Sequence, residues 1–178
     1  MPLPEESLRQ IADCCSTVNV AHGENLYEEG QRVSRCYFLK NGLVRAYSMK
    51  DGKEVTFWFG SDGDVIYPMY TVMYHGRGQY ETIEALEDTE FYEVDLWHMS
   101  RLFETDIHIA NWGRCFAERG CINAEQMFID RQFLTATERY EQLVKKNPEI
   151  CRRVPLGIIA SYLGISQVSL SRIRAGKQ

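Results

Sequence analysis

From Val18 to about Val94, short apolar and aromatic runs alternate with polar turn sequences that contain glycine. The runs are CYFL, LVRAYSM, EVTFWF, YETIEAL and EFYEV, and Gly30, Gly42, Gly52 and Gly63 recur between them about every eleven residues. Short strands at regular spacing, joined by glycine turns, are typical of a β-sandwich or a jelly-roll barrel. We therefore expect a β-roll here and an α+β fold for the whole chain.

After Asp95 the pattern becomes helical, and it predicts a short helix over residues 96–103 and a long one over 107–134. A further short helix is expected within residues 1–17, with Leu8 and Ile11 on one side. Small residues recur at heptad spacing along the long helix, at Ala110, Ala117 and Ala124. Such a stripe lets another helix approach closely. It is equally consistent with packing on the chain's own roll and with pairing to a second copy.

A new unit begins at Thr135, where the sequence TATE fits a capping box between Thr135 and Glu138. The helix that follows is expected to end at Pro148, and Arg152 and Arg153 are expected in a connector. The unit closes with residues 156–173.

Residues 156–173 place a small residue, a glycine and several apolar residues where two crossed helices need them. These positions are Ile159, Ala160, Leu163, Gly164, Ile165, Leu170 and Ile173, with Val168 as a flanking anchor. Gly164 can adopt the left-handed turn conformation and Ser166 can cap the second helix. The pattern predicts a helix-turn-helix, whose second helix would enter the DNA major groove. A helical hairpin used only for packing is the alternative.

Charge is distributed unevenly between this unit and the remainder of the chain. Residues 135–178 contain eight basic and three acidic residues, a formal net charge of +5, whereas the other 134 residues carry −10. A basic module on an acidic chain suggests a polyanionic partner for the module. The candidate DNA-binding residues are Ser166, Gln167, Ser169, Arg172, Arg174 and Lys177. Gln167 and Arg172 can reach base edges, whereas Arg174 and Lys177 are either phosphate contacts or a solvated tail.

Other classes of protein find little support in the sequence. No apolar run approaches the roughly 18 to 20 residues that span a bilayer, and no secretory signal begins the chain, so we expect a cytoplasmic protein with no membrane partner. The six cysteines, at positions 14, 15, 36, 115, 121 and 151, lack zinc-site spacing and are expected to be free thiols. The adjacent pair Cys14 and Cys15 fits redox chemistry or ordinary packing. No HxH metal motif supports an enzyme.

The order of roll, long helix and helix-turn-helix resembles the cyclic-AMP receptor protein/FNR family of bacterial transcription regulators. Segments that carry the resemblance are HGENLYEEGQ, YFLKNGLVRAY, DGKEVTFWFGSDGDV, ETIEALEDTEFYEVD and the tail from TATERYEQ to SLSRI, which is most similar to the branch common in Bacteroidetes-type bacteria. The resemblance implies a sensor roll over 1–106, a dimerisation helix over 107–134 and a DNA-binding unit over 135–178. It implies a homodimer on a palindromic DNA site, with RNA polymerase as a further partner.

The ligand site departs from the family pattern. By our alignment, Pro68 replaces the ribose-binding Glu, Gln79 and Tyr80 replace the phosphate-binding Arg-Ser pair, and Ala124-Glu125 replaces the purine-binding pair. A buried phosphate would lack its cationic partner, which is costly. We therefore expect no binding of cyclic AMP. The candidate pocket, formed by Tyr67, Pro68, Met69, Gln79, Tyr80, Ala124 and Glu125, would hold another small molecule, aromatic or uncharged, or stand unused.

Two further departures concern cofactors and DNA. Cys14, Cys15 and Cys36 do not have the iron–sulfur spacing of FNR-like members, and a haem ligand such as His22 or His75 is not expected, so no cofactor is predicted. Many relatives carry Glu where this chain has Val168, so the DNA site should differ from the common one. A small-molecule-binding signalling module whose helix-turn-helix no longer reads DNA is the alternative function.

Overall fold

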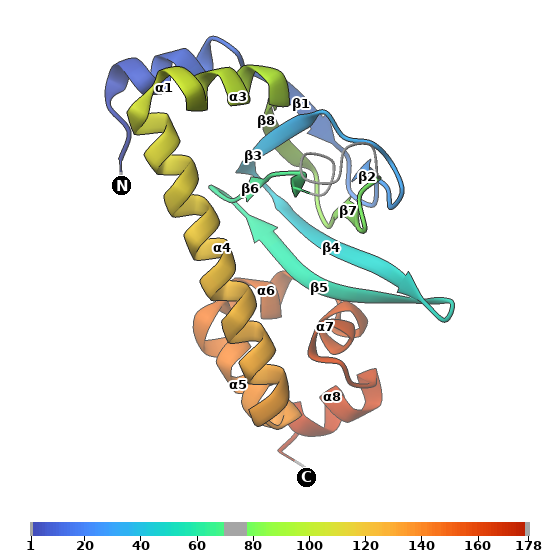
Figure 1. The fold of residues 1–178 in the computed structure, drawn as a ribbon. Helices are drawn as coiled ribbons and strands as arrows, with labels where there is room; N and C mark the ends of the chain where they lie inside the picture. Colours follow the sequence, from blue (N-terminus) through green and yellow to red (C-terminus); the bar gives the residue numbers. More distant parts are fainter. Residues whose placement is uncertain (1, 70–77, 177–178) are drawn as a thin grey trace.

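The computed structural model describes residues 2–69 and 78–176. A β-roll lies beside the first half of the long helix α4 (Ile107–Phe133), and a group of short helices lies beside its second half (Figure 1). Within the described residues, no single helix is long and apolar enough to cross a membrane. Only α7 (Leu156–Leu163) and α8 (Gln167–Arg174), taken together, reach that length and composition, and they are bent by 99°.

The roll consists of two antiparallel four-stranded sheets that face each other across an apolar core. The first has the order β1 (Ser16–Val20), β8 (Thr89–Asp95), β3 (Arg35–Asn41), β6 (Val65–Ile66), and the second has the order β2 (Asn25–Tyr27), β7 (Thr82–Ala85), β4 (Leu43–Lys50), β5 (Lys53–Ser61). All five predicted strand runs are confirmed. The strands β1, β2 and β6 were not predicted. The core contains Tyr27, Leu39, Val44, Ile83 and Phe91.

Glycine is required at the turn between β3 and β4. Gly42 has a φ of 131°, and a Cβ added there would lie 2.4 Å from Oγ1 of Thr89. Any side chain would therefore be strained and would also collide with β8. This close approach holds the two sheets in register at the point where the chain passes from one to the other.

Three helices close one end of the roll: α1 (Glu5–Ala12), α3 (Leu96–Thr105) and the start of α4. Their shared core includes Ile11, Cys36, Val94, Met99 and Ile109. The predicted short N-terminal helix is confirmed, but its expected apolar side is only half right. Ile11 is buried, whereas Leu8, three residues earlier, is 51% exposed.

The long helix α4 begins on the roll and ends away from it. Asp106 caps its first turn, accepting hydrogen bonds from the backbone N–H groups of His108 (2.7 Å) and Ile109 (3.2 Å). Trp112 packs on Phe38 of β3, with ring centroids 5.9 Å apart. A Cβ at Gly113 would lie 2.7 Å from Cε1 of Phe103, so this glycine allows α3 to pack closely on α4.

Four helices follow: α5 (Ala136–Lys146), α6 (Pro148–Arg153), α7 (Leu156–Leu163) and α8 (Gln167–Arg174). The capping box is present: Thr135 Oγ1 accepts from the Glu138 N–H (3.3 Å), and Glu138 accepts from the Thr135 N–H (2.8 Å). The expected connector around Arg152 and Arg153 is instead the short helix α6. Pro148 does end α5, but it also occupies the first position of a new helix, where its missing N–H has no effect.

Candidate nucleic-acid interface and its contact with the roll

Helices α7 and α8 form the crossed pair that the sequence predicts. Their bend of 99° lies within the range typical of a helix-turn-helix. Gly164 ends α7 in the left-handed conformation (φ 70°), and Ser166 caps α8 by accepting from the Ser169 N–H at 3.1 Å. Ile159, Ala160, Leu163 and Leu170 are buried between the helices and against α5, with Ile165 partly buried at the turn. Local capping and burial thus fix how α8 is presented.

One side of α8 is anchored and the other is free. Leu170 is fully buried, whereas Gln167, Ser171 and Arg172 are exposed. Val168, expected as a flanking anchor, is 63% exposed, so that expectation is wrong. The reason is geometric, because two residues along a helix turn the side chain by about 200°, away from the face that Leu170 occupies.

The residues predicted to bind DNA have different surroundings. Ser166 and Ser169 shape the start of the helix, with their hydroxyl oxygens 2.9 Å apart. Gln167 lies against α7, since a Cβ added at Gly157 would come within 3.3 Å of its Oε1. Arg172 and Arg174 are exposed, and no ion pair involves either of them within residues 2–69 and 78–176. Lys177 lies outside the described residues, as does His75.

Several cations of the module are already engaged within the chain. Arg153 pairs with Glu87 of the roll, and Arg152 pairs with Glu149. Arg139 donates to the Leu163 carbonyl at 3.0 Å. Among the described residues of the module, the exposed cations left for a polyanion are Lys145, Lys146, Arg172 and Arg174.

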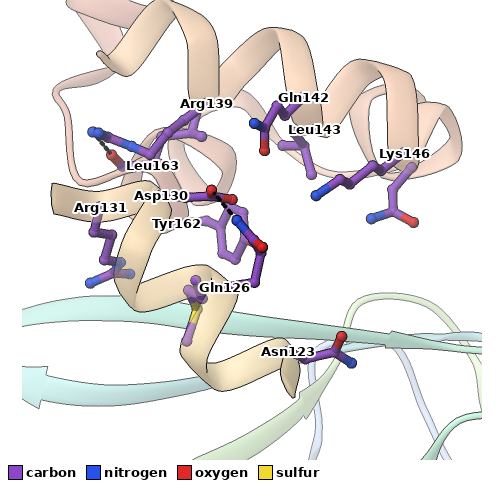
Figure 2. Close-up of a pocket in the computed structure, with 12 residues that line it drawn as sticks. Asn123, Gln126, Asp130, Arg131, Arg139, Gln142, Leu143, Lys146, Tyr162 and Leu163 are labelled. Carbon is purple, nitrogen blue, oxygen red and sulfur yellow. Dashed lines mark hydrogen bonds between the residues drawn. The ribbon is translucent and has the colours of Figure 1, made fainter. Parts of the chain in front are cut away.

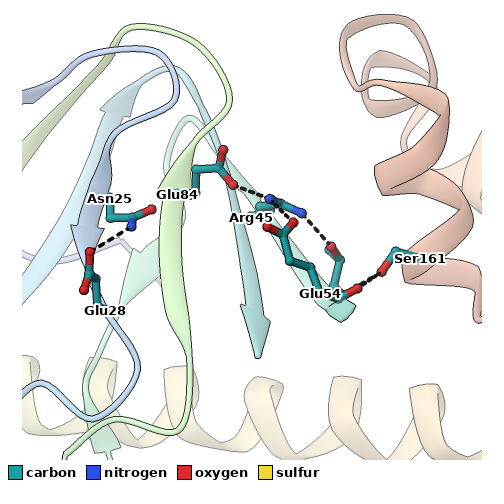
Figure 3. Close-up of polar contacts among 7 residues, drawn as sticks. Asn25, Glu28, Arg45, Glu54, Glu84 and Ser161 are labelled. Carbon is teal, nitrogen blue, oxygen red and sulfur yellow. Dashed lines mark hydrogen bonds and ion pairs between the residues drawn. The ribbon is translucent and has the colours of Figure 1, made fainter. Parts of the chain in front are cut away.

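Helix α7 contacts the roll through a serine (Figure 3). The Ser161 hydroxyl accepts from the Thr56 N–H (3.0 Å) and donates to the Glu54 carbonyl (2.8 Å). β5 is the last strand of its sheet, and an edge strand presents unpaired backbone groups of both kinds. Phe59 and Tyr162 add a ring contact beside it, with centroids 5.1 Å apart. The roll therefore covers α7 and leaves the outer side of α8 free.

Beneath this contact lies a buried arginine that ties three strands together. Arg45 of β4 bonds Glu84 of β7 and Glu54 of β5, both at 2.6 Å (Figure 3). Its guanidinium also lies over the Tyr47 ring, 4.3 Å from the centroid. Glu54 therefore accepts from Ser161 through its backbone carbonyl and pairs with Arg45 through its carboxylate. Because of this double role, the docking surface for α7 is a fixed part of the sheet.

The serine contact predicts a measurable local effect. In Ser161→Ala, the Thr56 N–H and the Glu54 carbonyl lose their partner, and the N–H should exchange about fivefold faster, corresponding to about 1 kcal/mol. Amide hydrogen exchange by NMR measures it. Ser100→Ala, an exposed serine of α3, is the matched control. Unchanged exchange at Thr56 would show that this hydroxyl does not hold α7 to the roll.

The residues predicted for a ligand pocket in the roll lie in different surroundings. Pro68 and Gln79 are buried, whereas Met69 and Tyr80 are each 49% exposed. Tyr67 packs near Phe103 of α3, and burial raises its pKa, while Tyr80 stacks on Phe57 of β5. The last two predicted residues, Ala124 and Glu125, are exposed on α4.

A carboxyl group lies next to the position expected for a phosphate. Glu81 follows Gln79 and Tyr80, and its Oε1 accepts from the Tyr27 hydroxyl at 2.9 Å. Burial raises the pKa of Glu81, and hydrogen bonds from Tyr27 and Tyr80 oppose that rise. Burial also raises the pKa of Tyr27, which keeps it a donor. A buried carboxyl group at this place supplies no cation to balance a phosphate, which disfavours an anionic ligand.

Sequence reasoning missed two adjoining cavities. The first lies between α4, α5 and α7 (Figure 2), and the second also has Trp58 and Phe59 of the roll in its wall. Their volumes are about 170 and 260 Å³, and both are lined by Asn123, Leu143, Asn147 and Tyr162. Burial raises the pKa of Tyr162. None of the seven residues predicted for the roll pocket lines either cavity. No sequence motif could have indicated them, because their walls come from segments far apart in the chain.

The six cysteines are free, as expected. Cys36 is buried, and burial raises its pKa to about 12; burial also raises the pKa of Cys15. These groups are therefore weakly ionised, which favours packing over redox chemistry for this cluster. Within the described parts of the chain, no three His, Cys, Asp or Glu side chains gather in a group that could hold a metal ion.

A jelly roll joined by a long helix to a pair of crossed helices, with the outer face of α8 exposed, defines the class of fold. The sequence profile of the cyclic nucleotide-binding domain matches residues 17–106. The chain belongs to that family. No curated protein is significantly similar to the sequence.

Solved structures extend the similarity over nearly the whole chain. FixK2 from Bradyrhizobium japonicum has a TM-score of 0.75 at 20% identity over 91% of this chain and 83% of its own. A CooA mutant from Carboxydothermus hydrogenoformans has 0.77 at 16% identity, over 98% and 85%. A CRP/FNR-family regulator from Eubacterium rectale has 0.76 at 17% identity, over 98% and 83%. The predicted CRP/FNR fold is confirmed, whereas the Bacteroidetes-type branch stays a prediction.

Proposed function

We propose that this chain is a homodimeric DNA-binding transcription regulator, not an enzyme, whose roll senses a small molecule other than cyclic AMP. The observation that carries the proposal is the free outer face of α8. Because the roll packs on α7, the outer face of α8 stays exposed and can enter the major groove of DNA.

Charge supports DNA as the partner. The helical module has a formal net charge of +5, and its exposed cations include Lys145, Lys146, Arg172 and Arg174. Cations placed on phosphates release counterions, which favours binding at low salt. The acidic remainder of the chain, at −10, opposes non-specific adhesion elsewhere on its surface.

The second half of α4 supports a dimer. Ile122, Phe128, Ile129 and Phe133 are 62%, 65%, 40% and 80% exposed, and at about 100° per residue they span about 140° of the helix circumference. The cavity-lining residue Asn123 lies outside this arc, so pairing would leave the cavities open. A large exposed apolar face marks an interaction surface, and a second copy of α4 offers a matching one. Two α8 helices would then read a palindrome.

For the effector, we propose an aromatic or uncharged molecule. The phosphate-binding Arg is replaced by Gln79, and the carboxyl of Glu81 follows it closely. Both features disfavour a cyclic phosphate. The junction cavities, lined by amides and by Tyr162, are a second place where an effector would act on both the roll and the helical module.

The proposal predicts salt-dependent binding of a palindromic duplex that depends on Arg172. Arg172→Ala should weaken binding by about 1–3 kcal/mol per half-site, because it removes a charged contact from the centre of the presented face. Fluorescence anisotropy with a duplex selected from random DNA measures it. Arg101→Ala, which removes the same charge from exposed α3, is the control. Equal affinity of the two variants would contradict the assigned docking.

One observation favours the second candidate, a small-molecule signalling module that no longer reads DNA. Val168, an apolar residue, lies at the centre of the exposed face of α8, where hydrogen bonds to base edges would need polar side chains. Thermal stabilisation by a cell-extract ligand, with no duplex retained at low salt, would establish that module and refute the regulator.

A further inference from the structure

Val168 stands at the centre of the face that α8 presents to solvent. Leu170, the fully buried residue of this helix, marks the inward direction, and partly buried Ile173 lies beside it. At about 100° per residue, the direction opposite to these two side chains falls on Val168. Its 63% exposure agrees with this placement.

The neighbours of Val168 on this face are all polar. Arg172 follows it by four residues, one turn along the same side, and Ser171 and Gln167 flank the pair. Within the described residues, Val168 belongs to no apolar cluster. It is therefore a single apolar contact point in the middle of a polar and cationic helix face.

A valine in a DNA groove can recognise only one chemical group. It has no hydrogen-bond donor or acceptor, and the apolar group that base pairs present in the major groove is the 5-methyl of thymine. Its branched side chain is held in one rotamer on a helix, so its methyl groups have a fixed position. The charge of the module supplies the attraction to DNA, and Val168 adds selectivity.

We propose that Val168 contacts the 5-methyl group of a thymine, so that each half-site contains one T·A pair required for its methyl group. This inference rests on the proposed function. Side chains four apart on a helix have Cβ atoms about 5–6 Å apart, which spans one to two base-pair steps of about 3.4 Å. The required thymine should lie within two base pairs of the one that Arg172 contacts.

The first experiment replaces thymine with deoxyuracil in a duplex selected from random DNA, one symmetric pair of positions at a time. This change removes the methyl group and keeps every hydrogen bond. One position should lose affinity, by about fourfold per half-site and about fifteenfold for the whole palindrome, as expected for one buried methyl group at each contact. Thymines at the other positions serve as internal controls.

The second experiment repeats the series with Val168→Ala and Ser169→Ala. Val168→Ala should bind the thymine and deoxyuracil duplexes equally, whereas Ser169→Ala should keep the wild-type difference. No methyl effect at any position, or an effect that persists in Val168→Ala, would overturn the inference. In either case salt-dependent, Arg172-dependent binding would leave the proposed function intact. If no duplex binds the wild-type chain at any salt concentration, the proposed function fails and this inference fails with it.

Discussion

Replacing Phe128 with glutamate is expected to convert the proposed dimer to a monomer and to weaken binding to a palindrome by about 100-fold or more. The physical reason has two parts. A carboxylate in an apolar helix interface would have to be desolvated, and two half-sites bound by linked modules gain about 10²–10⁴ in affinity over one. Sedimentation velocity and duplex titration measure the two effects separately.

The matched control is Asn123→Glu, which adds the same charge about 140° around α4 from Phe128, outside the exposed apolar arc. It should remain dimeric and bind the palindrome with nearly wild-type affinity. If Phe128→Glu also stays dimeric at micromolar concentration, the exposed face of Ile122, Phe128 and Ile129 is not the interface, and the proposed two-fold docking is wrong.

Leu170→Ala is expected to destabilise the helix-turn-helix by about 2–5 kcal/mol, because it leaves a cavity where a fully buried side chain joins α8 to α5 and α7. Backbone amides of residues 156–174 should exchange faster by the factor that corresponds to this loss of stability. DNA binding should be lost as a consequence. Hydrogen exchange with mass spectrometry measures the first, and duplex titration measures the second.

Val168→Ala provides the comparison on the same helix, two residues away. Because Val168 is 63% exposed, its truncation should change stability by no more than about 0.5 kcal/mol. Similar exchange rates in the two variants would show that α8 is not anchored through Leu170. A large loss of stability in Val168→Ala would show that this residue packs in solution, contrary to its exposure here.

The sequence was most informative where the signals are local. The long strands were predicted because apolar runs and turn glycines delimit them, and α3 and α4 were predicted from their periodicity. The missed strands β1, β2 and β6 have only five, three and two residues. β2 and β6 contain too few alternations to show a pattern, and β1 has only two apolar residues, whereas the four-residue β7 was predicted because it lies within the longer run YETIEAL.

Val168 shows the limit of the same method within the site. An apolar residue beside known anchor positions looks like another anchor when only composition is considered. Its direction follows from the phase of α8, and that phase is defined by which residue, here Leu170, is buried against α5 and α7. Once Leu170 is taken as the buried anchor, the helical repeat alone places Val168 about 200° away, on the exposed side.

By itself, the sequence determined the helix-turn-helix: the capping serine, the turn glycine and the apolar spacing act over a few residues, so they form the motif wherever the module lies. Only the tertiary structure decided which face of the motif is covered. That choice depends on Ser161 meeting the edge of β5, where the bonded residues are separated by 105 and 107 positions in the chain. Interactions over such separations depend on the whole fold of the roll, and no local pattern encodes them.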